Sequence, residues 1–217
     1  MSREVLEWTH YNSREGEKKV LVIGDSIMWG SRSYIERALP KGLALTIVVS
    51  AHGVNEEQLL KSVPLLAMLN DKEYEAVYFN NGLHPRGQSA DEYEANYERV
   101  VRELMREVCA KRWILGLSTP ISNDQTALWE DDAPITEREK VSLREKNELV
   151  IEYNKRVRAI SERLCVPCFD LYAVVEGRDE LKTDPYHYND EGRRIVGEAV
   201  CGRLIEEINK GKEKDDV

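Results

Sequence analysis

Short apolar runs alternate with longer charged stretches along most of this 217-residue chain, and this alternation constrains its fold more than any other feature. Apolar runs of about four to eight residues between turn residues are typical of strands buried in a parallel sheet. Most of the stretches between them are long enough for amphipathic helices that connect one strand to the next. The sequence therefore predicts an α/β fold with a mostly parallel, five-stranded sheet covered by helices on both faces. The expected strands are 19–23, 44–49, 76–79, 113–117 and 166–170, and the expected helices are 33–39, 56–69, 90–109, 137–164 and 190–209.

The length and composition fit one domain of this kind. A chain of this size buries a substantial core but falls short of two ordinary domains. Hydrophobic residues make up 41% and charged residues 33%, as in a globular protein whose helices carry charged faces. We expect a single domain over 18–210, with an N-terminal arm at 1–17 and a polar tail at 211–217.

The charge pattern limits the classes of partner. The formal net charge is −9, and the basic residues are interspersed with glutamates, so the sequence offers no basic stripe for a nucleic acid backbone. No stretch approaches the ~18 apolar residues of a membrane-spanning helix, and the first residues lack the apolar run of a signal peptide. We expect a cytoplasmic protein without a membrane span and without a nucleic acid partner.

The four cysteines contain one pair with the spacing of a redox or metal motif, Cys165-Val-Pro-Cys168. A zinc site needs further ligands at matching spacing, and the sequence has no second pair of this kind. Buried, reduced thiols are the simpler interpretation for the cysteines at 109, 165, 168 and 201. No metal is therefore expected.

Ser26 is the first candidate for chemistry. It follows the expected strand 19–23 in the sequence Gly24-Asp25-Ser26, and ligands of parallel sheets bind at the carboxyl ends of strands. At that position the hydroxyl can face a cleft, while the backbone N–H near a helix N-terminus points to where an oxyanion would develop. The same residues also serve as a turn and a helix cap, which is the alternative role of Asp25.

A nucleophilic serine needs a base, and the chain has only four histidines, at 10, 52, 84 and 187. His187 lies directly before the helix expected from 190, and Asp184 lies three residues upstream of it. A carboxylate in this position can hold the imidazole in the tautomer that accepts the serine proton. A loop aspartate and histidine are often only a cap and a surface residue, so the prediction of a triad depends on Ser26.

With these motifs, the chain resembles the SGNH/GDSL hydrolases from Lys19 to about Ile205. Gly24-Asp25-Ser26-Ile27 matches the first block of that family, which contains the nucleophile. Asp184-Pro185-Tyr186-His187-Tyr188-Asn189-Asp190-Glu191-Gly192 is similar to the last block. The resemblance implies a flavodoxin-like three-layer α/β/α sandwich. It also implies a serine esterase without a metal or organic cofactor, in which Ser26, His187 and Asp184 form the triad and an acyl-enzyme is the intermediate.

The family's second block supplies a glycine whose backbone N–H joins that of the nucleophile in the oxyanion hole. Ala51-His52-Gly53-Val54 stands at this place, which makes Gly53 the candidate, although a glycine needed only for a turn leaves the same trace.

The third block departs from the family pattern Gly-x-Asn-Asp. The chain reads Asn80-Asn81-Gly82-Leu83-His84-Pro85, so His84 takes the place of the asparagine that donates to the oxyanion. An imidazole N–H can donate the same hydrogen bond, and the side chains of Asn80 and Asn81 are the alternatives.

The family includes carbohydrate O-acetyl esterases, lysophospholipases, thioesterases and arylesterases, so the fold does not identify the substrate. Polar and aromatic cleft candidates favour a small ester with a short acyl group, such as an acetylated sugar. A lysophospholipase or thioesterase is the alternative, and a non-catalytic glycan- or protein-binding domain is another. The polar segment 121–139 is either a lid or a solvated connection. The expected substrate contacts are Trp29, His52 and Tyr186, and further cleft candidates are Asn80, Asn81, Arg86 and Trp129.

Overall fold

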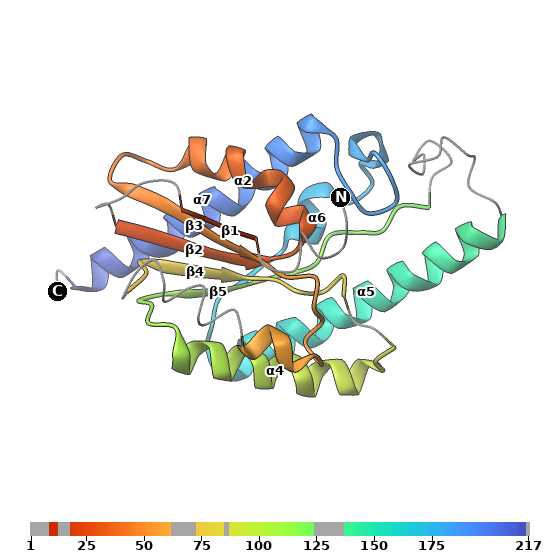
Figure 1. Ribbon diagram of the computed structural model, residues 1–217, viewed down its shortest axis with the longest axis horizontal. Coiled ribbons are helices and arrows are strands. Elements are labelled where there is room, and N and C mark those ends of the chain that lie inside the picture. The colour runs from red at the N-terminus through yellow and green to blue at the C-terminus, as the bar shows by residue number, and fades with distance from the viewer. Residues whose placement is uncertain (1–8, 13–17, 62–72, 85–86, 124–136, 216–217) are drawn as a thin grey trace.

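A six-stranded sheet in the order β1-β3-β2-β4-β5-β6 runs through the middle of the protein (Figure 1). The structure is a computed structural model that describes residues 9–12, 18–61, 73–84, 87–123 and 137–215. The strands are β1 Thr9–Asn12, β2 Lys18–Gly24, β3 Leu43–Val49, β4 Ala76–Phe79, β5 Trp113–Gly116 and β6 Cys168–Phe169.

The five strands from β2 to β6 are parallel, which confirms the predicted sheet. The chain leaves β2 for β3 on one side and then crosses to β4 on the other, so the strand order reverses at β2. This is the flavodoxin-like order, and such a reversal opens a crevice at the carboxyl ends of the strands.

Strand β1 was not predicted. It lies within the expected N-terminal arm and pairs antiparallel with β3, with His10 opposite Val48. An edge strand is held mainly by backbone hydrogen bonds to one neighbour, so its side chains need no apolar pattern that a sequence could reveal.

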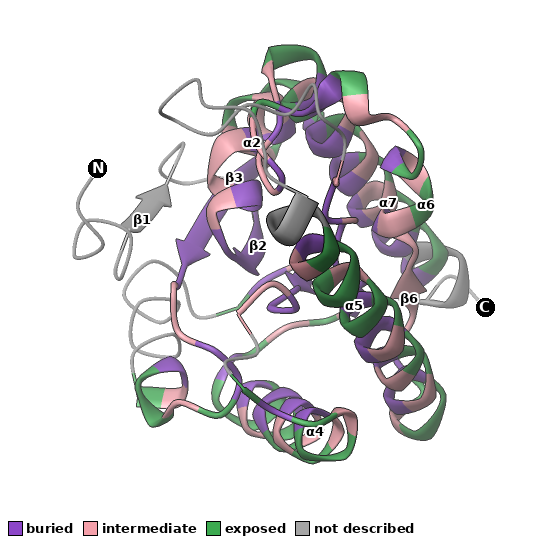
Figure 2. Ribbon diagram, turned by 90° about the vertical axis from the view of Figure 1, so that its right-hand side faces the viewer, coloured by how far each residue is buried: buried purple, intermediate pink, exposed green. Residues whose placement is uncertain are grey.

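Helices cover both faces of the sheet, as predicted (Figures 1 and 2). One layer contains α2, α6 and α7, and the opposite layer contains α4 and α5. The helices are α2 Ser26–Ala38, α4 Ala90–Glu107, α5 Glu137–Leu164, α6 Leu171–Val175 and α7 Asp190–Asp215, and a 3₁₀ turn, η1, spans Asp179–Leu181.

Strand β2 separates two apolar cores. Val20 and Val22 belong to the cluster under α2 and α7, whereas Leu21 and Ile23 belong to the cluster under α4 and α5. Successive side chains of a strand point to opposite faces, so a continuous apolar run is what a strand buried on both sides requires. This burial fixes β2 at the centre of the molecule, with its carboxyl end at the crevice.

Local sequence signals explain two helix positions. Ser89 and Glu92 form a reciprocal capping box at the start of α4. Helix α7 approaches α2 closely at Gly197, where a Cβ atom would lie 2.9 Å from the carbonyl oxygen of Ser31. Any larger residue there would push the two helices apart.

Several boundaries differ from the predicted ones. Helix α5 and strand β4 match their predicted ranges, but α2 begins at Ser26 rather than at residue 33. Helix α7 continues to Asp215 and so includes most of the expected tail. The short elements α6 and η1 were not predicted. Of the expected helix 56–69, residues 57–61 are helical and 62–72 lie outside the described residues, as do 124–136 of the segment 121–139.

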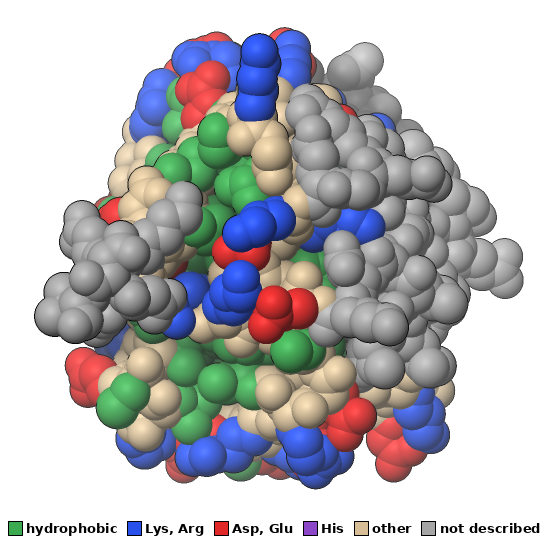
Figure 3. Space-filling view, turned by 90° about the vertical axis from the view of Figure 1, so that its left-hand side faces the viewer, with side chains coloured by type: hydrophobic (Ala, Val, Ile, Leu, Met, Phe, Trp, Pro, Cys, Tyr) green, Lys and Arg blue, Asp and Glu red, His purple; other side chains and the backbone are tan. Residues whose placement is uncertain are grey.

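The surface at the amino ends of the strands carries both signs of charge. In Figure 3 the basic and acidic side chains of the described residues lie next to one another on this face. Glu75, for example, accepts a hydrogen bond from Lys111 at 2.8 Å and lies 3.5 Å from Lys18. Within the described part of the chain, no helix is both long and apolar enough to cross a membrane.

Candidate active site

Ser26 lies at the point where the strand order reverses. Only Asp25 separates it from the end of β2, and it is the first residue of α2. Asp25, which is 1% exposed, caps this helix by accepting a hydrogen bond from the backbone N–H of Ile27 at 2.9 Å. The cap starts the helix at once after the strand, so the backbone N–H of Ser26 belongs to the positive end of the helix dipole.

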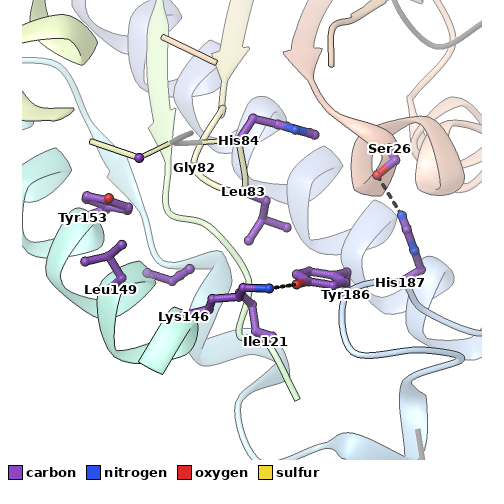
Figure 4. Close-up of a pocket in the computed structure, with 12 residues that line it drawn as sticks. Ser26, Gly82, Leu83, His84, Ile121, Lys146, Leu149, Tyr153, Tyr186 and His187 are labelled. Atoms are coloured by element: carbon purple, nitrogen blue, oxygen red, sulfur yellow. Dashed lines mark hydrogen bonds between the residues drawn. The ribbon is translucent and has the colours of Figure 1, made fainter. Parts of the chain in front are cut away.

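Ser26, His187 and Asp184 form a continuous hydrogen-bonded chain (Figure 4). The Oγ of Ser26 lies 2.9 Å from the Nε2 of His187. The other ring nitrogen of His187, Nδ1, lies 2.7 Å from the Oδ2 of Asp184. These distances leave Nε2 as the atom that can accept the serine proton, with Nδ1–H donating to the carboxylate. The structure thus brings together three residues that are up to 161 positions apart in the chain.

Asp184 is held by more than the imidazole. Its Oδ1 accepts hydrogen bonds at 2.8 Å from the backbone N–H groups of both Tyr186 and His187. Burial by itself would raise the pKa of Asp184, but these hydrogen bonds and that of the His187 ring outweigh it and lower the pKa to about 2. Asp184 is therefore a carboxylate at neutral pH.

The same carboxylate raises the pKa of His187. The hydrogen bond to Asp184 is the main cause, burial opposes it, and the negative charge of Asp25 adds to the increase. A base with a raised pKa is a stronger acceptor for the serine proton, and the imidazolium that results is stabilised by the neighbouring carboxylate.

The loop that holds His187 is tied at both ends. Thr183 N–H donates to the carbonyl of His187 at 3.0 Å, and Asn189 N–H donates to the carbonyl of Leu181 at 2.8 Å. The side chain of Asn189 then caps α7 by accepting from the N–H of Gly192 at 2.9 Å. These hydrogen bonds hold the loop at both ends, beside the start of α7.

The Gly53 amide has a partner within the protein. It donates to Oε2 of Glu56 at 2.6 Å, and the same oxygen lies 3.3 Å from Nδ1 of His52. A Cβ atom on Gly53 would overlap the carbonyl oxygen of His84, so only glycine lets the loops after β3 and β4 pack this closely. The oxyanion role of Gly53 remains a prediction, and its N–H is available to a substrate only when Glu56 moves.

The two asparagines after β4 also use their amide groups inside the protein. Nδ2 of Asn80 donates to the Gly116 carbonyl at 2.8 Å and lies 3.2 Å from the Ser118 hydroxyl. Nδ2 of Asn81 donates to the carbonyl of His52 at 2.9 Å. These bonds connect the loops at the ends of β3, β4 and β5. In contrast, the side chain of His84 points toward Ser26 in Figure 4.

A cavity of about 570 Å³ opens beside Ser26 and His187. Apart from these two residues, its walls are mainly apolar and aromatic, and much of one wall comes from α5. The wall residues are Gly82, Leu83, His84, Gly87, Ile121, Lys146, Leu149, Val150, Tyr153 and Tyr186. Sites of this size that combine apolar walls with a few polar groups are typical of small-molecule binding.

Comparisons with known proteins find proteins of the same fold but no relative by sequence. No family model matches the sequence, and no curated protein matches it significantly. Among solved structures, a carbohydrate acetylesterase from Sinorhizobium meliloti is 15% identical, with a TM-score of 0.66 over 88% of this chain and 99% of that one. An aryl esterase from M. smegmatis is 14% identical, with a TM-score of 0.68 over 87% and 99%. A member of the lipolytic protein G-D-S-L family from Veillonella parvula is 12% identical, with a TM-score of 0.64 over 85% and 97%.

This chain has the SGNH/GDSL hydrolase fold. At these identities the likeness establishes the architecture alone. The three predicted substrate contacts of this chain do not all lie at the cavity. Tyr186 lines the cavity, whereas Trp29 and His52 are not among the described residues that line it. The guanidinium of Arg32 instead lies 3.9 Å from the centre of the Trp29 ring. Arg86 and Trp129 lie outside the described residues.

Two asparagines of α5 were missed by the sequence analysis. Asn154 makes two hydrogen bonds of 2.9 Å with the backbone of Ser118, and Asn147 accepts from the N–H of Ile121 at 2.8 Å. They attach α5 to the segment after β5 and so fix one wall of the cavity. Their spacing of seven residues places them on one face of the helix, but a polar side chain on a charged helix gave no signal of this role.

The cysteine pair is not joined by a disulfide, and one of its two thiols is not activated. Both Cys165 and Cys168 are free thiols, and burial raises the pKa of Cys168 to about 11, which makes its thiolate scarce at neutral pH. Among the described residues, no group of three or more histidine, cysteine or acidic side chains is arranged to hold a metal ion.

Proposed function

We propose that this chain is a serine esterase that hydrolyses small-molecule esters, with Ser26 as nucleophile, His187 as base and Asp184 as its orienting carboxylate. The observation that carries the proposal is the hydrogen-bonded chain from the Ser26 hydroxyl to the Asp184 carboxylate, with distances of 2.9 and 2.7 Å. The likeness to esterases of the same fold adds support.

The geometry suggests a two-step reaction. The Oγ of Ser26 attacks the ester carbonyl carbon while Nε2 of His187 takes the hydroxyl proton. The tetrahedral intermediate then breaks its bond to the alcohol oxygen, which leaves with that proton from His187. A water molecule next gives a proton to His187 and attacks the acyl carbon, and Ser26 leaves with the proton returned.

The negative charge of each tetrahedral intermediate needs donors on the side of Ser26 away from His187. The Ser26 N–H at the start of α2 is one candidate, since the helix dipole favours an anion there. The Gly53 N–H and the His84 ring are the other two, and Asn80 and Asn81 remain the alternatives to His84.

For the substrate, two observations favour different groups. The likeness to a carbohydrate acetylesterase of the same fold favours a substrate with a short acyl group, such as the acetyl ester of a sugar. The apolar walls formed by Leu83, Ile121 and Val150 favour a larger apolar acyl or alcohol group, as in an aryl or longer-chain ester. We take the acetyl ester as the first candidate and the apolar ester as the second.

Hydrolysis of the p-nitrophenyl esters of acetate, butyrate and octanoate tests both parts of the proposal. Ser26→Ala should abolish hydrolysis of all three, and Ser33→Ala, an exposed serine on the same helix, is the matched control. The highest kcat/KM on acetate, with release of acetate from acetylated xylo-oligosaccharides, supports the first substrate. The highest value on octanoate supports the second.

Labelling by a fluorophosphonate separates an esterase from a binding domain. We expect the native protein and Ser33→Ala to be labelled and Ser26→Ala to remain unlabelled, because the probe reacts with an activated serine. A native protein that is neither labelled nor active on any of the three esters would exclude the triad mechanism. A non-catalytic glycan- or protein-binding domain would then be the better hypothesis.

A further inference from the structure

Lys182 is a buried lysine beside the proposed triad. It is 8% exposed and lies two residues before Asp184, directly after η1. Its Nζ donates to the carbonyl of Pro120 at 2.8 Å and to the carbonyl of Tyr186 at 3.0 Å. The same Nζ lies 3.8 Å from the centre of the Tyr188 ring. Two carbonyls and a ring face thus surround the three N–H groups of an ammonium ion.

These contacts join two segments that are far apart in the sequence. Pro120 belongs to the segment that follows β5, and Tyr186 is the residue before His187. A backbone hydrogen bond also joins these segments, from the N–H of Ser122 to the carbonyl of Pro185 at 2.9 Å. The Lys182 side chain therefore attaches the histidine loop to the segment after β5 in addition to this backbone hydrogen bond.

We propose that Lys182 is a positioning residue, whose ammonium group holds the loop of Asp184 and His187 against the segment after β5 and so keeps Nε2 of His187 in reach of Ser26. The inference rests on the proposed function, because it assigns Lys182 a role in the same reaction. It adds to that function a residue that does not touch the substrate or the reacting atoms.

Burying the charged side chain of Lys182 costs folding free energy, which an apolar residue in the same place would not. Burial lowers the pKa of Lys182 to about 7, and the nearby charges of Asp179 and Asp184 only partly oppose this. A charged amine in a low-dielectric site is destabilising, and an apolar side chain of similar length would avoid that cost. The gain from the lysine therefore lies in its directed hydrogen bonds and its charge.

The charge of Lys182 also acts on His187. The charged groups that influence His187 are Asp184 and Asp25, which raise its pKa, and Lys182, which lowers it. Removing the ammonium group should therefore raise the pKa of His187 further. A base with a higher pKa stays protonated to a higher pH, so the acid limb of the kcat/KM profile should move to higher pH.

The variants Lys182→Met and Lys182→Gln separate the hydrogen bonds from the charge, because their side chains have similar length and only glutamine keeps donor N–H groups. Lys155→Met, an exposed lysine paired with Glu152 on α5, is the control. We expect Lys182→Met to lose about 10- to 100-fold in kcat with little change in KM, since misplacing a catalytic group acts on the chemical step. Lys182→Gln should recover part of kcat, and both variants should shift the acid limb to higher pH.

A folded Lys182→Met with native kcat and a native acid limb overturns the inference, even if its melting temperature is lower. The same changes in Lys155→Met overturn it as well. If Lys182→Met does not fold, the kcat and the acid limb of Lys182→Gln decide the question in the same way.

An NMR titration of the His187 ring tests the electrostatic part without any turnover, which is practical with only four histidines in the chain. We expect a higher His187 pKa in the Lys182 variants than in the native protein, and an unchanged pKa contradicts the inference. If the native protein hydrolyses no ester and is not labelled, the proposed function fails while this titration still decides whether Lys182 acts on His187.

Discussion

The two sides of Ser26, the proposed nucleophile, differ in how far they are prepared for the proposed reaction. On the acid/base side, His187 and Asp184 already make the hydrogen bonds that proton transfer requires. On the oxyanion side, the Gly53 amide is bonded to the carboxylate of Glu56. One side is thus complete within the protein alone, whereas the other must exchange a protein acceptor for the substrate.

The difference follows from how each side is built. Asp184 and His187 lie three residues apart on one tied loop, so short-range contacts set their geometry. The oxyanion candidates come from three loops after β2, β3 and β4, and their mutual distances depend on how these loops pack. Electrostatic stabilisation acts best when the donors are already aimed at the developing charge. A carboxylate such as Glu56 at one of these donors opposes that charge.

The largest effect is expected on the complete side. His187→Ala should lower kcat by about 10⁴-fold or more, because without a base the serine hydroxyl is a weak nucleophile. The double variant Ser26→Ala/His187→Ala should be no slower than either single variant, since residues that act as a unit are not additive. Steady-state hydrolysis of p-nitrophenyl acetate measures both. Additive losses would show that the two residues do not act together.

Asp184→Asn should reduce kcat by about 10³- to 10⁴-fold, because the imidazole loses the carboxylate that selects its tautomer. Steady-state hydrolysis of p-nitrophenyl acetate measures this loss.

In the native protein, activity should fall as the pH drops through the raised pKa of His187, since the base must be neutral. The stability contributed by charged His187 has the opposite trend, being complete below pH 6.5 and lost as the pH rises through the folded-state pKa. In Asp184→Asn the acid limb of kcat/KM should move to lower pH. An unmoved limb would mean that another group sets it.

His84→Ala should cost about 10²-fold in kcat if the imidazole is an oxyanion donor. His84→Asn should retain more activity than His84→Ala, because an asparagine amide can donate the same kind of hydrogen bond. A loss of less than about threefold in both variants would transfer the role to Asn80 or Asn81. The comparison uses kcat on p-nitrophenyl acetate with melting temperatures as the check on folding.

The smallest effect tests the incomplete side from the opposite direction. Glu56→Gln should increase kcat by roughly two- to tenfold, because it removes a negative charge from the Gly53 amide near the expected oxyanion. Glu57→Gln is the matched control, since that neighbouring carboxylate is exposed and paired with Lys61. A decrease in kcat for Glu56→Gln would mean that Glu56 supports the native loop instead of restraining catalysis.

Part of the site could be predicted from the sequence because its signals are local. A strand buried on both faces must be a continuous apolar run. For this reason the sequence predicted β4 and the strand β2 that precedes Ser26. The spacing of Asp184 and His187 was a weaker signal, because a loop aspartate and histidine are often only a cap and a surface residue, and it gained its meaning from Ser26. The start of α2 was missed because Gly30 and the polar residues around it weaken the helical pattern, whereas the Asp25 cap and packing on α7 sustain the helix.

The rest of the site depends on contacts between distant segments. Lys182 reaches Pro120 across 62 positions, and Asn154 reaches Ser118 across 36. Such residues look like ordinary charged or polar surface positions in a sequence, because burial and hydrogen-bond partners arise only when the loops pack.

By itself, the sequence determined the parallel α/β architecture and singled out Ser26, Asp184 and His187 as the candidate triad. The architecture follows from local patterning, in which side-chain periodicity and loop composition select strands, helices and turns. The candidate triad follows from short motifs and from their resemblance to the blocks of the SGNH/GDSL hydrolases. Only the tertiary structure decided which groups surround those residues: the apolar cavity along α5, the carboxylate on the Gly53 amide and the buried ammonium beside Asp184. The physical reason is that these features are distances between segments, and distances between segments are set by packing rather than by any single stretch of chain.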